Sequence, residues 1–210
     1  MAGGAQIEAR DNELEATPLH VAAYRNRPDI VKTLLDVYTA SINAIDKNGQ
    51  NALHRAAGRG HVQVVKTLLS FDHCDVNAKG WLGRTALHSA CMKGHVACIH
   101  ELMAGGAQIE ARDSEREATP LHLAAACNHQ DSARTLVDVY SASINATDKH
   151  GLTAMHLAAY HGYTDVARVL ASNAQCDVTV SDSHGLTAAD VAIRREHQDI
   201  VVLLEGKFQN

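Results

Sequence analysis

The heptapeptide TPLHVAA at residues 17–23 decides the fold, because close copies of it recur along the chain. The copies read NALHRAA, TALHSAC, TPLHLAA, TAMHLAA and TAADVAI, and the six segments begin at positions 17, 51, 85, 119, 153 and 187. Each copy therefore starts 34 residues after the one before it. A fixed period of this length indicates repeated supersecondary units that stack to bury apolar faces which no single unit can bury.

Each unit is predicted to contain two helices and a turn. Thr17 and Thr119 stand where a hydroxyl can cap a helix, and the proline that follows each of them suits the first helical position. After a short turn, the pattern VVKTLL from Val64 places apolar residues on one face of a second helix. The sequences DKNG at residues 46–49 and DKHG at 148–151 then predict hairpin fingers between units.

The period and the T-P-L-H motif resemble the ankyrin repeat, and the resemblance covers essentially the whole chain. It implies an all-α solenoid of stacked repeats with a period of 34, each a helix-turn-helix unit with a β-hairpin finger. The register divides the chain into a tail and finger of a truncated repeat, five full repeats and a C-terminal capping repeat, over residues 1–16, 17–50, 51–84, 85–118, 119–152, 153–186 and 187–210.

A longer period lies above the first. The segment MAGGAQIEARD at Met1 returns at Met103, and DVYTASINAIDK from Asp36 returns as DVYSASINATDK from Asp138, in both cases 102 residues later. The chain is therefore an internal duplication of a three-repeat block. The fingers DNELEAT and DSEREAT, which precede repeats 1 and 4, lack the turn glycine and are predicted to differ in shape from the others.

Composition restricts the compartment and the kinds of ligand. The net charge is -5, and residues 106–210 hold 8 basic against 14 acidic residues, which disfavours nucleic acid as a partner. The longest apolar stretches are far shorter than the roughly 20 residues that span a bilayer, so we expect no membrane insertion. The five cysteines form no C-x-x-C pair, which favours a reducing compartment, the cytoplasm or the nucleus.

The histidines are predicted to be structural. Of the 14, five follow the T-x-L motif, at positions 20, 54, 88, 122 and 156. The resemblance implies that these side chains form hydrogen bonds within and between repeats. Histidines on stacked helices roughly 8–10 Å apart are also too widely spaced to share one zinc ion. No phosphate loop, nucleophile elbow or kinase signature is present, so we expect no metal, no cofactor and no enzymatic activity.

In ankyrin repeats the finger tips and the ends of the first helices line the concave face, and the register assigns those positions here. Arg25, Arg59 and Lys93 would form a basic row, with Trp81 in a nearby finger. Two alternatives stay open: the row is solvated surface, or Trp81 packs on its neighbouring finger. The predicted partner-binding residues are Tyr24, Arg25, Arg55, Arg59, Trp81, Arg84, Met92, Lys93, Tyr160 and His161.

These features predict a non-catalytic, monomeric protein-interaction module, part of a scaffold or adaptor. Its partner is expected to be a protein or extended peptide with acidic residues beside an apolar anchor. The alternative function is a direct inhibitor or regulatory subunit of an enzyme such as a kinase, phosphatase or ubiquitin ligase. The resemblance further implies asparagine hydroxylation, for which Asn77 in LSFDHCDVN is the best candidate.

Overall fold

The computed structural model describes residues 6–209, which form two compact units. Unit 1 comprises residues 6–90 and 97–108, and unit 2 comprises residues 91–96 and 109–209. Residues 1–5 of the predicted N-terminal tail and residue 210 of the predicted capping repeat lie outside the described part of the chain.

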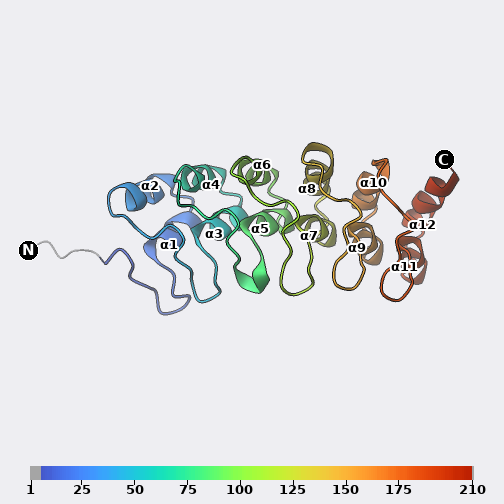
Figure 1. The fold of residues 1–210 in the computed structure, drawn as a ribbon, viewed down its shortest axis with the longest axis horizontal. Coiled ribbons are helices and arrows are strands. Elements are labelled where there is room, and N and C mark those ends of the chain that lie inside the picture. The colour runs from blue at the N-terminus through green and yellow to red at the C-terminus, as the bar shows by residue number, and fades with distance from the viewer. Residues whose placement is uncertain (1–5, 210) are drawn as a thin grey trace, which may run out of the picture. The chain divides into compact units, whose positions relative to one another are not determined.

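Unit 1 is a stack of helix pairs. Its helices are α1 (Pro18–Tyr24), α2 (Pro28–Asp36), α3 (Ala52–Arg59) and α4 (Val62–Leu69), with most of α5 (Ala86–Met92) and α6 (Val96–Ala104). The first helix of one repeat packs on the first helix of the next, α1 on α3, while α2 packs on α4. Figure 1 shows these as two rows, with the finger loops extending from the row of first helices.

Unit 2 repeats the same arrangement. It contains α7 (Pro120–Ala126), α8 (Gln130–Arg134), α9 (Ala154–His161), α10 (Thr164–Ser172), α11 (Ala188–Arg194) and α12 (Gln198–Glu205). Helix α8 continues into a π-helical turn (Thr135–Val139). The first helices α7, α9 and α11 pack in sequence, as do the second helices α8, α10 and α12 (Figure 1). The predicted all-helical stack of repeats is confirmed in each unit.

The helices start and pack as the sequence dictates. Thr17 and Thr119 are the N-caps of α1 and α7, with proline at the first helical position. In each of repeats 2 to 6, one leucine of the second helical segment is completely buried, whereas the equivalent Leu34 of repeat 1 is 8% exposed. These leucines recur every 34 residues and are Leu68, Leu102, Leu136, Leu170 and Leu204. Their 34-residue spacing indicates that burial between stacked repeats imposes the period.

The fingers are tight turns, which differs from the predicted β-hairpins. Within residues 6–209 the backbone pairing of strands is limited to one antiparallel bridge, between Ser181 and Thr187. An aspartate side chain closes the turn instead. In the finger of residues 46–50, for example, Asp46 Oδ1 accepts hydrogen bonds from the backbone amides of Asn48 at 2.7 Å and Gln50 at 3.0 Å.

The fingers before repeats 1 and 4 do differ from the others. Glu15 and Glu117 adopt left-handed backbone conformations, with φ of 53° and 56°. Arg10 donates to the Glu15 carbonyl at 3.0 Å, and Arg112 donates to the Glu117 carbonyl at 2.9 Å. These bonds hold a conformation that non-glycine residues otherwise adopt at some cost.

Candidate partner-binding surface

We use the term finger face for the surface that the finger turns and the C-terminal ends of the first helices form within each unit. Motif histidines fix this face. His20 Nδ1 accepts the backbone N–H of Thr17 at 3.2 Å, so the ring proton is on Nε2, which donates to the Gln50 carbonyl at 2.9 Å. His122 and His156 make the same bonds to the fingers that follow them. The predicted structural role of these histidines is confirmed.

The finger face of unit 1 carries a stacked pair of a tyrosine and an arginine. The Arg59 guanidinium lies over the Tyr24 ring, 4.0 Å from its centroid, and also donates to the Tyr24 hydroxyl. Both side chains are exposed, as is that of Arg25. Such a pair restricts the arginine and presents a cation beside an aromatic ring. The structure thus brings together two of the predicted partner-binding residues.

Arg55 is placed differently from the others. Its side chain is 11% exposed and forms an ion pair with the fully buried Asp46, at 2.5 Å. Because Asp46 closes the turn of its own finger, Arg55 joins the start of repeat 2 to that finger. In the structure its guanidinium is therefore directed to the protein interior, where a partner cannot easily contact it.

Trp81 is 54% exposed in a short 3-10 turn (Trp81–Gly83) at the tip of a finger. It borders a small cavity of about 210 Å³ with Asn48 and Gln50 of the preceding finger. The indole therefore lies beside its neighbouring finger and still exposes more than half of its surface. Arg84, which ends this turn, is half-buried.

The other predicted residues belong to unit 2. Met92 is half-buried and its carbonyl accepts a hydrogen bond from His129, whereas Lys93 is exposed. Arg25 and Arg59 are in unit 1 and Lys93 is in unit 2, so the three-membered basic row stays a prediction. Tyr160 and His161 are exposed at the end of α9, and their rings contact edge to face.

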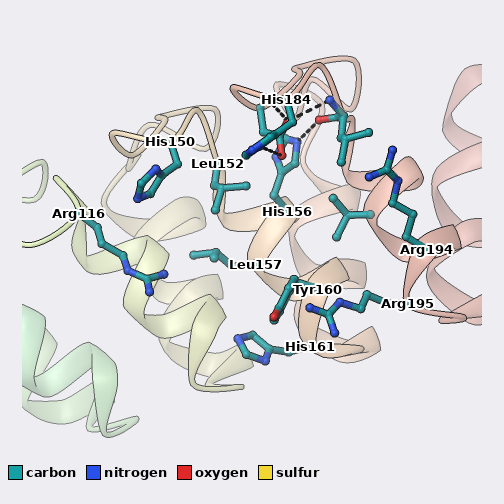
Figure 2. A pocket seen from close by; sticks show the side chains of 13 residues that line it. Arg116, His150, Leu152, His156, Leu157, Tyr160, His161, His184, Arg194 and Arg195 are labelled. Carbon is teal, nitrogen blue, oxygen red and sulfur yellow. Dashed lines mark hydrogen bonds and ion pairs between the residues drawn. The ribbon is translucent and has the colours of Figure 1, made fainter.

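Tyr160 and His161 border a pocket that the sequence interpretation missed (Figure 2). The pocket has a volume of about 540 Å³, within the usual range for a ligand site. Besides apolar residues, it is lined by basic side chains from three fingers and two first helices, which include Arg116, Arg194 and Arg195. The Arg195 guanidinium lies 3.8 Å from the centroid of the Tyr160 ring, a second pair of the kind that Arg59 and Tyr24 make.

Asn77 is half-buried and connects two loops of unit 1. Its amide group donates to the Gly106 carbonyl at 3.2 Å and accepts from the Gln108 amide at 2.8 Å. Asn43 and Asn145 form equivalent bonds to the following repeats. The structure therefore gives the three asparagines one architectural role, and the preference for hydroxylation at Asn77 stays a prediction.

Within residues 6–209, no group of three or more histidine, cysteine or acidic side chains is placed to hold a metal ion. The same part of the chain contains no helix that is long and apolar enough to span a membrane. The cysteines of residues 6–209 form no disulfide, and burial raises the pKa of Cys74 and Cys98 to about 11, so these two thiols stay protonated at neutral pH.

Comparisons with known proteins agree with the repeat architecture. Family models described as ankyrin repeats (3 copies) match residues 2–80 and 73–148, and one described as ankyrin repeats (many copies) matches residues 136–192. The crystal structure of the ankyrin repeat domain of Bcl-3, described as a unique member of the IkappaB protein family, is similar with a TM-score of 0.82. The two sequences are 30% identical over 95% of this chain and 87% of that one. No curated protein sequence matches this chain. The chain belongs to the ankyrin-repeat family.

Proposed function

We propose that this chain is a non-catalytic module of a scaffold or adaptor, which binds an extended peptide or a folded protein through its finger face. Ankyrin repeats are protein-protein interaction modules, which supports the general function. The observation that carries the proposal is the exposed indole of Trp81 at a finger tip. Tryptophan is the residue type most enriched where binding energy concentrates, and in water an exposed indole lacks the apolar contacts that a partner would supply.

The unit 1 finger face favours a partner with acidic residues beside an apolar anchor. Arg25 and Arg59 are exposed cations, and Tyr24 offers an aromatic surface under the Arg59 guanidinium. An acidic side chain could pair with Arg59 while an apolar side chain covers Trp81. Rim charges of this kind act mainly on association rate and specificity, whereas a buried aromatic anchor slows dissociation.

The proposal is tested by affinity purification from cell extract with the wild-type chain and the Trp81→Ala, Arg59→Glu double variant. A Lys32→Glu variant is the control, because Lys32 is an exposed cation on helix α2, away from the finger face. Proteins that bind through the finger face should be lost with the double variant and kept with the control. Equal recovery with all three chains would refute the proposed surface.

The alternative function, a direct inhibitor of an enzyme, requires that binding lower the activity of the partner. If the captured protein is an enzyme, its catalytic rate should fall when the chain is added and recover with the double variant. A scaffold or adaptor would bind without changing that rate. We propose tethering as the function, with an unchanged rate as its expected result.

A further inference from the structure

The pocket of unit 2 exists because the two halves of the duplication have diverged. A shift of 102 residues places Leu157 at the position of Arg55. In unit 1, Arg55 crosses toward the finger and pairs with Asp46. In unit 2, the equivalent Asp148 is buried and accepts backbone hydrogen bonds from its own finger, at 2.8 and 2.9 Å, while Leu157 leaves an apolar floor.

Two other substitutions between the halves give the pocket its walls. Arg116, in a finger, replaces Leu14, and Arg194, at the end of α11, replaces Met92. Both arginines are exposed and line the pocket. One half of the duplication thus carries leucine and methionine where the other presents two cations.

The electrostatic character of the pocket is opposite to that of its surroundings. Three arginines line it, whereas its one lining acid, Asp182, already accepts backbone hydrogen bonds from His184 at 2.8 Å and Leu186 at 3.0 Å. Residues 106–210 are acidic overall. Three arginines against one carboxylate leave an excess of positive charge in the lining of a pocket that lies in an acidic half. This excess favours an anionic ligand, because such a cleft focuses the field that a ligand meets.

The arginines do not converge on one point. In Figure 2, Arg116 lies on one side of Leu157 and Tyr160, while Arg194 and Arg195 lie on the other side. A single phosphate could contact one side only and would leave the apolar floor uncovered. An extended chain with separated carboxylates could reach both sides and place an apolar side chain on the floor between them.

We propose that the unit 2 pocket binds an extended peptide segment in which acidic side chains flank an apolar one. The central side chain contacts Leu157 and the Tyr160 ring, one acidic side chain pairs with Arg116, and the other pairs with Arg194 or Arg195. Carboxylate pairing with guanidinium groups is favourable because both are planar and can share two hydrogen bonds. The inference rests on the proposed function, since it assigns protein binding to the same face, and it adds a second site to that of Trp81.

The test begins with selection of phage-displayed random peptides on the immobilised wild-type chain. The dissociation constant of the most enriched peptide is then measured by fluorescence anisotropy. The variants Arg116→Leu, Leu157→Arg and Arg194→Met each install the residue of the other half of the duplication. Arg168→Met removes an exposed cation from α10, outside the pocket lining, and is the control.

Enriched peptides should carry acidic residues on both sides of an apolar one. Arg116→Leu and Arg194→Met should each weaken binding about tenfold, Leu157→Arg should weaken it more because its side chain fills the floor, and the control should bind as the wild type does. Leu157→Arg is checked by thermal unfolding, and the two exposed arginine variants test the pocket even if it unfolds.

The proposal would be overturned by enrichment without acidic residues, by no enrichment, or by an equal loss with Arg168→Met. Tighter binding of a single-stranded oligonucleotide than of the peptide would do the same. The Trp81→Ala, Arg59→Glu variant separates this inference from the proposed function. It should keep the peptide affinity even where it loses proteins from extract, because it leaves the unit 2 pocket intact.

Discussion

Replacement of Gly94 by alanine tests the contact that holds consecutive repeats together in unit 2. Gly94 has φ of +75°, and a Cβ built there would lie 2.5 Å from His129 Nδ1 and 2.9 Å from its Cε1. His129 Nε2 donates to the Met92 carbonyl at 3.0 Å, so the ring cannot move away without weakening that bond. The substitution therefore combines backbone strain with displacement of a neighbouring repeat.

The magnitude follows from these two parts. A left-handed backbone costs an alanine about 1–2 kcal/mol. Forcing the His129 ring away adds about 1–3 kcal/mol of overpacking and the loss of part of a hydrogen bond. Gly185 is the matched control, because its φ is +74° and nothing lies within 4 Å of its Cβ position. We expect Gly94→Ala to lower the free energy of unfolding by about 3–5 kcal/mol and Gly185→Ala by about 1–2 kcal/mol.

Urea unfolding followed by circular dichroism at pH 7 measures both losses. A double-mutant cycle compares Gly94→Ala and His129→Ala with the variant that carries both substitutions. Gly94→Ala should lower the free energy of unfolding less in the His129→Ala background, because the methyl group then has room. Equal losses for the two glycine variants, or a fully additive double variant, would refute the contact between Gly94 and His129 as the source of the effect.

Three further predictions follow from the core and the loops. Leu68→Ala should lower the free energy of unfolding by about 2–5 kcal/mol, because Leu68 is completely buried between repeats, and unchanged thermal unfolding would contradict this register. Burial lowers the pKa of His20, His122 and His156 below the ordinary value of about 6.5, so the unfolded chain binds more protons below that pH. The free energy of unfolding should therefore be nearly constant between about pH 7 and 8 and fall between about pH 7 and 5, and a His122→Asn, His156→Asn variant should show a shallower fall relative to its own value at pH 7.5. When the chain is expressed in a cell that hydroxylates ankyrin asparagines, mass spectrometry should find Asn77 modified ahead of Asn43 and Asn145, and modification of either of those alone would reject the ranking.

The fold could be predicted because its determinants are local and repeated. Thr17 followed by Pro18 specifies a helix start within a few residues, and the period of 34 shows that the same apolar face must be covered six times. The shape of the fingers was harder to predict from the sequence. Their expected strands are turns closed by side chains such as Asp46, and the sequence pattern of a turn does not show whether flanking residues extend into a ladder.

The candidate site was predicted in part. Register placed Tyr24 and Arg59 on one face, and the structure shows them stacked. Register could not show that Arg55 pairs with Asp46, because that depends on how a finger folds over the following helix. The unit 2 pocket was missed because it depends on residues from several repeats. The pocket could have been suspected from a comparison of the two halves of the duplication, in which Leu157 stands at the position of Arg55.

Protein binding through the finger face is tested most directly by photo-crosslinking from two positions in unit 1. A photoreactive amino acid at Trp81 samples the finger face, and one at Gln63 samples the exposed side of helix α4. In cell extract, we predict crosslinked protein adducts from position 81 that compete with unmodified wild-type chain, and none from position 63. Competed adducts from position 63 alone would contradict the assignment of protein binding to the finger face.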